Sequence, residues 1–450
     1  MFSRSDRCGI ALADRVAGPS GATASWQRAP RYGAARMRRR AICSIVVLAV
    51  GCAGCGGKTS LFNSSKPIRT VTVPVTSTSA HAPASGSSTT SSPLDLGIPA
   101  LATKNTSRVD GSDPVSDAAG VALAVFPSVA PGTHPTAVTL APTDDWPAAI
   151  AASSLMAPPF RAPVLLSGPS SLPAITLNAL KLLAPTGNGS AGGAQVIRIG
   201  DVPAPSGVHS TYIGGNGPYA LAAAIDSYET HERGRPSVNV VVASTDAPAY
   251  AMPAAGYAAE SGEPVLFVDS AGVPAPTAQA LAAHKHPHIY VLGPPSVISA
   301  SVVAELARYG TVKRISGIDP ASTSVDFAEY RDPPCAFGQP CVHVPGSFGW
   351  AIRSPGHAYV LINQNSTLDA AAAAALSSSG GYGPQLLVQN PNSLPTSVLN
   401  YFLDYATPGY TQEGPTAAVY NHAWLIGDPG EISVAVQGQV DSLLEAVPQR

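Results

Sequence analysis

Short runs of β-branched and aliphatic residues alternate with alanine-rich stretches through most of the chain. After residue 109 each apolar run is followed by a small polar loop, and then by a segment whose apolar residues recur at three- and four-residue spacing. An alternation of strand-like and helix-like segments is typical of a parallel sheet covered by helices. The pattern therefore predicts an α/β fold after residue 109.

The predicted elements recur in the same order three times, which indicates tandem repeats. Each unit has three predicted strands, with an alanine-rich helix after the first and a leucine-spaced helix after the second. The first strands lie at 137–141, 238–243 and 358–362, the second at 162–166, 263–267 and 384–388, and the third at 196–201, 289–294 and 423–428. The β-α-β-α-β order predicts three Rossmann-like, doubly wound repeats, each with a small parallel sheet.

The repeats fix an expected domain organisation. We assign repeat 1 to 109–210, repeat 2 to 211–313, and repeat 3 to 314–450 with an insertion at about 330–352. Units with so few charges expose apolar helix faces that neighbouring copies can cover, so we expect a monomer with an internal pseudo-threefold arrangement. The central strands should bury three equivalent leucines, Leu165, Leu266 and Leu387.

Three short motifs accompany this order: an Ala-Pro-apolar-Leu-Leu strand at 162–166, a Ser-Leu-Pro helix start at 171–173, and a Tyr-Val-Leu-Gly strand at 290–293 followed by the apolar segment 297–303. In this shared order, residues 109–450 resemble the cell-wall-binding repeat type 2 family, which occurs as tandem triplets in surface proteins of Gram-positive bacteria. The resemblance implies non-catalytic binding to cell-wall polymer.

The sequence departs from two signatures of that family. The opening Gly-x-Asp-Arg-Tyr-x-Thr keeps Gly and Asp at 111–113 and 317–319 but only the first Gly at 215–217, and its Thr survives only as Thr323. The Phe-Pro-Asp-Ala-Leu signature keeps its acid only at Asp369. These departures leave the predicted fold supported by the order of the elements, but they weaken the case for a ligand site inherited through the signatures.

The N-terminal segment 1–55 reads as a secretion signal. Three arginines at 38–40 precede ten apolar residues, a run too short to span a membrane as a helix. The run ends in Leu-Ala-Val-Gly-Cys-Ala-Gly-Cys, which resembles a lipobox, so lipidation is expected at Cys52 or, alternatively, Cys55. A plain soluble secretory signal is the other interpretation. Met37 would start a signal of normal length, unless residues 1–36 are a true extended n-region.

Residues 56–108 are rich in Ser, Thr, Pro and Ala. Such a segment buries too little apolar surface to offset its conformational entropy, so we expect a disordered tether. Signal, lipid and tether together predict export to the outer face of the cytoplasmic membrane or the cell wall.

Charge argues against nucleic acid as a partner. Only 12% of the 450 residues are charged, and beyond Cys55 the chain carries 17 basic and 26 acidic side chains, a net charge of −9. The same acidity is the main objection to an anionic wall polymer. Such a polymer would have to bind through backbone N–H groups, bridging cations or the less acidic first two units.

Polar residues at the predicted carboxyl ends of the first strands are the candidate ligand-binding residues, because ligands of open α/β sheets bind there. Helix capping is the alternative role for such short polar side chains. The candidates are Asp144, Asp145, Asp246, Asn363 and Asn365, together with Asp369, the acid kept from the family signature.

Two cysteines and a histidine cluster could also carry chemistry. Cys335 and Cys341 are the only cysteines beyond the signal region, and they lie in one short predicted loop. Because the chain is expected to be exported, we predict a disulfide between them. Three histidines alternate at 284, 286 and 288, a spacing that would suit a metal only on an extended strand. Pro287 places them in a loop between a helix and a strand, which favours a solvated loop over a metal site. The sequence has no nucleophile with a plausible base beside it, and it predicts no catalytic residue, metal or cofactor.

The sequence thus predicts a lipid-anchored, non-catalytic envelope protein. Its expected partner is a cell-wall polymer or a peptidoglycan-associated glycan, bound through three pseudo-equivalent repeats whose weak contacts combine. The alternative function is a solute-binding lipoprotein that captures a small molecule between repeats.

Overall fold

The computed structural model describes Leu96 and residues 100–334, 346–378, 382–411, 414, 416 and 418–448. The predicted signal, nearly all of the tether, and Cys52, Cys55, Cys335 and Cys341 lie outside these residues. None of the described helices is long and apolar enough to cross a membrane.

Three small sheets of parallel strands, the third with one antiparallel edge strand, carry the fold, in agreement with the predicted fold class. The first sheet has the order β4-β3-β5-β6 and the second the order β10-β9-β7-β8. Both place the predicted first strand at the centre, next to the second and third. The strands of the first sheet are β3 (Val138–Pro142), β4 (Val164–Ser167), β5 (Val196–Ile199) and β6 (Ser210–Ile213). Those of the second are β7 (Asn239–Ser244), β8 (Val265–Val268), β9 (His288–Leu292) and β10 (Thr311–Ile315).

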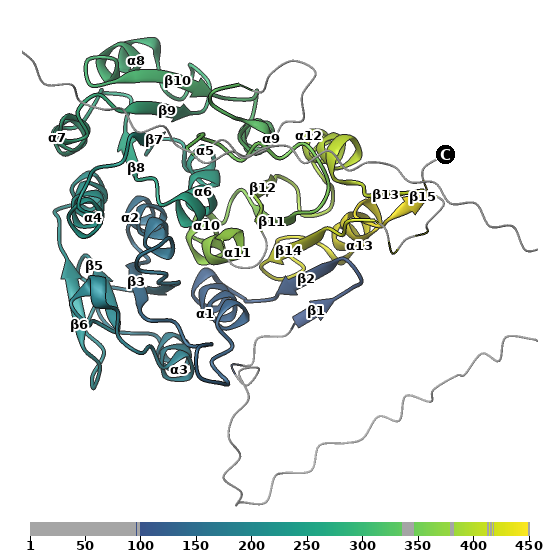
Figure 1. Cartoon of the computed structure of the whole chain (residues 1–450), viewed down its shortest axis with the longest axis horizontal. Coiled ribbons are helices and arrows are strands. Elements are labelled where there is room, and N and C mark those ends of the chain that lie inside the picture. The colour runs from purple at the N-terminus through teal and green to yellow at the C-terminus, as the bar shows by residue number, and fades with distance from the viewer. Residues whose placement is uncertain are drawn as a thin grey trace, which may run out of the picture. The chain divides into compact units, whose positions relative to one another are not determined.

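The third sheet is completed by the opposite end of the chain. Its order is β1-β2-β14-β11-β12, and β2 pairs in parallel with β14 with Val109 opposite Ile426. Figure 1 shows the blue β2 beside the yellow β14. The strands are β1 (Ala100–Ala102), β2 (Thr106–Val109), β11 (Ala358–Asn363), β12 (Gln385–Val388) and β14 (His422–Ile426).

This arrangement corrects two expectations. Residues 100–102 and 106–108, expected within the disordered tether, are strand. Each sheet also has a fourth parallel strand that the sequence analysis did not include: β6 and β10 in the first two sheets, and β2 in the third. β6 and β10 are edge strands that are only partly buried, and β2 has only four residues, so none of them shows the continuous apolar run of a central strand.

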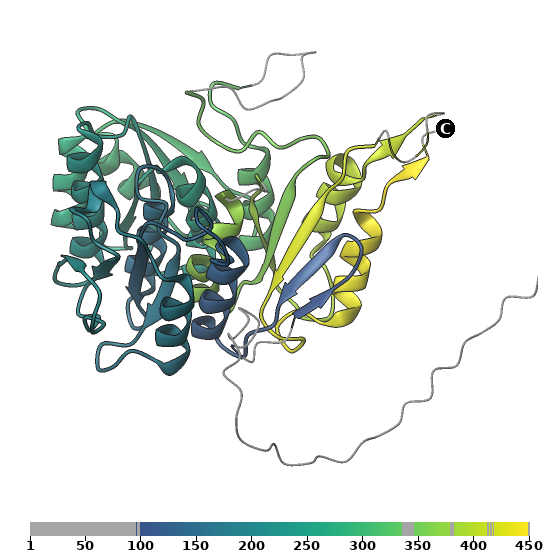
Figure 2. The same ribbon diagram turned by 60° about the horizontal axis from the view of Figure 1, so that its bottom comes forward.

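The helices cover both faces of the sheets (Figure 2). Helices after the fourth strands are α1 (Pro114–Val125), α4 (Pro218–Arg233) and α9 (Pro320–Glu329). Helices after the second strands are α3 (Ala174–Leu183), α7 (Ala275–Ala283) and α12 (Thr396–Tyr401), while α8 (Ala300–Leu306) and α13 (Val434–Leu443) follow the third strands of the second and third sheets. The short strands β13 (Gly409–Tyr410) and β15 (Val447–Pro448) pair with each other.

The alanine-rich helices after the first strands meet between the three sheets (Figure 1). We call them the hub: α2 (Trp146–Ala152), α5 (Pro248–Ala251), α6 (Pro253–Ser261), α10 (Thr367–Ala372) and α11 (Ala374–Ser378). Alanine lets helix axes approach closely, and at Gly256 there is no room even for a methyl group, because an added Cβ would lie 2.6 Å from Ser377 Oγ. The small residues of the predicted helices therefore serve packing between units.

The core confirms the predicted central strands. Leu165, Leu266 and Leu387 are all fully buried. The predicted insertion closes on itself where Asp332 and Phe348 exchange backbone hydrogen bonds at 2.9 Å. Phe348 stacks on Tyr290 with ring centroids 3.5 Å apart, which attaches the insertion to the second sheet.

Candidate functional site

In the first unit the predicted polar residues act on the helix start. The Asp145 carboxylate accepts a hydrogen bond from Ala148 N at 3.0 Å and caps α2. Burial raises the pKa of Asp145, and the Ala148 hydrogen bond opposes that rise. Asp144 beside it is exposed. The contacts of Asp145 are those of the capping alternative.

Asp246, the equivalent residue of the second unit, does not cap its helix. Its carboxylate accepts a hydrogen bond from Ser270 N at 2.7 Å, and so joins the loop after β7 to the loop after β8. The following helix α5 begins at Pro248 without a side-chain cap. Asp246 is exposed, so its present contact is to the adjacent loop alone.

The third unit brings its predicted residues into a buried arrangement. Asn363, at the end of β11, donates from Nδ2 to the Glu431 carbonyl at 2.8 Å, and its Oδ1 accepts from Asn365 N at 3.0 Å. Asn365 itself is exposed. Asp369, in the first turn of α10, has no exposed surface at all.

Asp369 belongs to a cluster of three carboxyls drawn from distant segments, which we call the acid cluster: Asp117 of α1, Asp369 of α10 and Glu431 after β14. Asp117 Oδ1 accepts from Gly111 N at 2.9 Å, and Glu431 Oε1 accepts from Ser366 Oγ at 2.7 Å. Among the described residues neither oxygen of Asp369, nor Oε2 of Glu431, has a hydrogen-bond donor. These oxygens can bond to one another only if a proton lies between them.

The electrostatics of the acid cluster favour bound protons. Burial raises the pKa of Asp117 to about 7, against the lowering effect of the Gly111 N–H, and the charge of Glu431 raises it further. Burial also holds the pKa of Asp369 well above its ordinary value, and the charges of Asp117 and Glu431 add to this. Within the described ranges no group of three His, Cys, Asp or Glu side chains is placed to hold a metal ion. Burial and mutual repulsion therefore favour the protonated forms of Asp117 and Asp369.

Asp117 was not among the predicted residues, although its role follows a family signature. In the third unit Thr323, at the signature's threonine position, accepts from Gly317 N at 3.0 Å. Asp117 accepts from Gly111 N in the same way, so an acid stands where the signature has threonine. Meanwhile the signature's aspartates, Asp113 and Asp319, cap α1 and α9.

Two arginines, Arg108, which is buried, and Arg314, which is half-buried, were also missed. Arg108 on β2 donates from Nη1 to the Gly427 carbonyl at 2.7 Å and from Nε to Gln437 Oε1 at 3.0 Å. Arg314 on β10 does the same in the second sheet, donating to the Gly293 carbonyl at 2.5 Å. The signal was present in the sequence, since each arginine stands three residues before the glycine of the opening signature.

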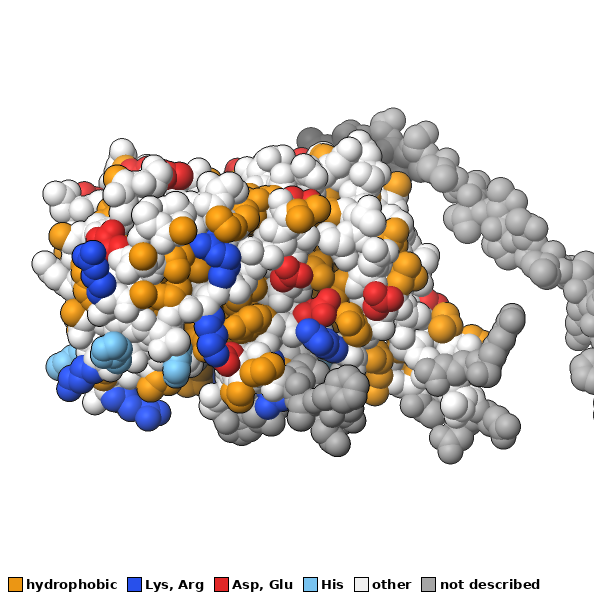
Figure 3. Space-filling view, turned by 90° about the horizontal axis from the view of Figure 1, so that it is seen from above, with side chains coloured by type: hydrophobic (Ala, Val, Ile, Leu, Met, Phe, Trp, Pro, Cys, Tyr) orange, Lys and Arg blue, Asp and Glu red, His pale blue; other side chains and the backbone are white. Residues whose placement is uncertain are grey.

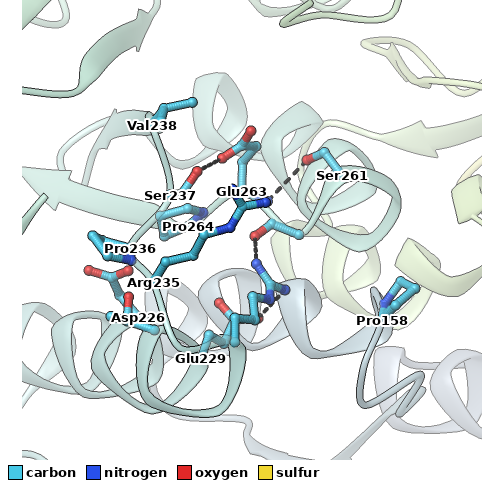
Figure 4. A pocket seen from close by; sticks show the side chains of 13 residues that line it. Pro158, Asp226, Glu229, Arg235, Pro236, Ser237, Val238, Ser261, Glu263 and Pro264 are labelled. Atoms are coloured by element: carbon cyan, nitrogen blue, oxygen red, sulfur yellow. Dashed lines mark hydrogen bonds and ion pairs between the residues drawn. The ribbon is translucent and has the colours of Figure 1, made fainter. Parts of the chain in front are cut away.

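A separate polar pocket lies at the amino end of the second sheet, at the opposite strand ends from the predicted residues (Figure 4). Its volume is about 320 Å³. It is lined by the end of α4, the loops before β7 and β8, and Pro158 of the first unit. Arg233 donates to Glu229 Oε1 at 3.1 Å, and burial raises the pKa of Glu229 to about 8.

The histidine cluster contributes to this end of the sheet and corrects the expectation of a fully solvated loop. His284 is buried, its Nε2 lies 2.8 Å from Asp226 Oδ2, and its Nδ1 lies 2.7 Å from the Ser237 carbonyl. Burial lowers the pKa of His284, but the hydrogen bond and charge of Asp226 outweigh it and leave the pKa raised. His286 and His288 are exposed.

Comparison with known proteins bears on the second unit first. Residues 212–303 match the family described as Cell wall binding domain 2 (CWB2), from β6 to the start of α8. The resemblance noted from the sequence is thereby confirmed, and a cell-wall-associated binding role is supported. No curated protein matches the chain.

Solved structures share the fold of the larger part of the chain. Cwp8 from Clostridium difficile is 17% identical with a TM-score of 0.56, over 76% of this chain and 52% of its own. Cwp6 from the same organism is 15% identical with a TM-score of 0.55, over 77% of this chain and 51% of its own. The chain thus spans about half the length of these structures, and the likeness is one of fold.

Proposed function

We propose that this chain is a non-catalytic protein of the cell envelope, which binds cell-wall polymer through three pseudo-equivalent units and is held at the membrane by an N-terminal lipid. The observation that carries the proposal is the CWB2 match at 212–303. That segment is one of three units whose parallel strands follow the same spatial order. We propose that the other two units bind the same polymer as the matched unit.

The connection of the three units to one another gives the proposal a physical basis. The three units are joined at the hub. They are also joined by β2, which precedes the first unit in sequence and completes the sheet of the third. Several weak contacts on one rigid scaffold combine through effective concentration, so a repetitive glycan binds more tightly than its single units would. A scaffold of this kind needs no deep pocket in each unit.

Co-sedimentation tests the proposal. The purified chain should sediment with isolated Gram-positive cell walls, and should stay in solution with walls stripped of their attached polymers by acid. Bovine serum albumin serves as the non-binding control. Equal recovery with intact walls and with no walls would refute wall binding.

Lipid anchoring is tested separately. We propose Cys52, or alternatively Cys55, as the lipidated residue, and the double change to Ser should release the protein from the membrane or leave the signal uncleaved. The single changes then identify which cysteine is used. Unchanged partitioning of the double variant into the detergent phase would contradict the anchor.

The solute-binding alternative rests on one observation, the pocket of about 320 Å³ where Pro158 of the first unit faces the second. A solute receptor would bind a small molecule tightly and would not sediment with walls. Wall sedimentation together with titration with small sugars therefore separates the two functions.

A further inference from the structure

The amino end of the second sheet is more basic than the chain as a whole. Five side chains here or on the loops leading into it are exposed and basic or titratable: Arg235, Lys285, His286, His288 and Arg308. The loops that carry them are neighbours, because His288 N donates to the Val238 carbonyl at 2.8 Å and Thr311 N donates to the Pro287 carbonyl at 3.0 Å. Figure 3 looks onto the side where α8 and β10 lie, and shows Lys, Arg and His side chains gathered at one end of it.

The acids of the pocket at this end are occupied. Asp226 is paired with His284, and Glu229 accepts from Arg233. Glu263 accepts from Ser237 Oγ and, at 2.8 Å, from Asn239 Nδ2. Each carboxylate that lines the pocket therefore has a protein donor of its own.

Arg235 is a cation of the pocket that is not paired with any of these acids. It lines the pocket and is exposed, and within the described part of the chain it has no ion-pair or hydrogen-bond partner. In Figure 4 its side chain extends across the pocket toward Ser261 and Glu263. Thr230, Ser237 and Ser261 line the same space with hydroxyl oxygens that can accept hydrogen bonds.

We propose that this pocket binds one acidic sugar residue of the wall polymer, with its carboxylate or phosphate group on Arg235 and its hydroxyls on the serine and threonine oxygens. Guanidinium groups suit both anions because their planar donors match carboxylate and phosphate oxygens. The volume is at the lower end of the usual range for ligand pockets, which suits a single sugar residue. The inference rests on the proposed function, and it reconciles a net charge of −9 with an anionic partner.

Titration of the purified full chain with three monosaccharides tests the site. Glucuronate carries a carboxylate, glucose 6-phosphate a phosphate, and glucose neither charge. We expect either anionic sugar, or both, to bind at least about tenfold more tightly than glucose, the effect of one charged hydrogen-bonding pair. The anion that binds identifies the group. Equal affinity for all three sugars, or no binding of the anionic ones, would overturn the proposal.

Matched variants locate the binding in the pocket. Arg235→Gln should weaken the anionic sugar by about tenfold and Arg235→Lys by less, since lysine keeps the charge but loses the fork of donors. Arg308→Gln removes an exposed arginine at the same end but outside the pocket lining, and should change affinity less than about twofold. Unchanged affinity of Arg235→Gln, with an unchanged melting temperature, would refute the site.

The wall assay separates this site from the proposed function. A chain that sediments with walls but binds neither anionic sugar refutes the pocket and leaves wall binding intact. A chain that binds an anionic sugar through Arg235 but does not sediment with walls supports the pocket and refutes the wall function.

Discussion

Because the acid cluster is buried, we predict that the free energy of unfolding falls as the pH rises toward neutrality. We expect Asp369→Asn to stabilise the protein at pH 8 and to change it little at pH 4.5. Asparagine needs no proton to remain neutral, and its amide can donate to the carboxyls that surround position 369.

The size of the effect follows from the pKa values. An acid whose pKa is raised by folding is stabilising while protonated, so its contribution is complete below the unfolded pKa and is lost as the pH rises through the folded pKa. For Asp117, whose pKa rises from 3.8 to about 7, the loss between pH 4 and pH 7 amounts to roughly 4 kcal/mol at about 1.4 kcal/mol per pH unit. Removing one of the three carboxyls should recover about 1–3 kcal/mol of this at pH 8.

Urea unfolding followed by tryptophan fluorescence measures the difference, since Trp350 is buried. Asp144→Asn is the matched control, because it makes the same chemical change at an exposed aspartate in the loop before α2 of the first unit. It should leave the free energy of unfolding unchanged at both pH values. If Asp369→Asn destabilises the protein at pH 8, an ionised Asp369 has a stabilising partner and the reasoning is wrong.

Three further predictions concern the packing of the units, each measured as a change in the free energy of unfolding. Gly256→Ala should cost about 1–3 kcal/mol, because the new methyl would meet α11 in the hub, whereas Gly438→Ala in the open face of α13 should be neutral or slightly stabilising; equal effects would contradict the close hub. Arg108→Met should cost at least about 3 kcal/mol, because Arg108 is buried and its carbonyl partners lose their donors; a change below about 1 kcal/mol would show that β2 does not hold the third sheet. Truncation to Ala of any one central leucine should cost ~2–5 kcal/mol, and a unit that tolerates it does not share the common core: Leu165, Leu266 and Leu387.

Local pattern was sufficient for the central strands. β7 and β11 are buried along their whole length, and such continuous apolar runs stand out in a sequence. The alanine-rich helices were likewise visible, because their composition differs from that of the loops beside them. The sequence therefore predicted nine strands to within two residues at either end.

The pairing of β2 with β14 could not be predicted in this way. β2 has only four residues, and its partner β14 begins at residue 422, so no local signal joins them. Asp117 gives a similar lesson: in sequence it is one polar residue of an amphipathic helix, and its burial arises only because α1 packs against α10. Residues that acquire their environment from a distant segment need the tertiary structure to be recognised.

The dependence of binding on polymer length tests the central claim most directly. Isolated wall polymer and fragments of it shortened to single repeating units would be titrated into the purified chain under identical salt conditions. If three pseudo-equivalent units bind one polymer, the long form should bind at least about a hundredfold more tightly per chain than the single unit, through effective concentration. Equal affinities for the long and short forms would contradict multivalent binding by the three units.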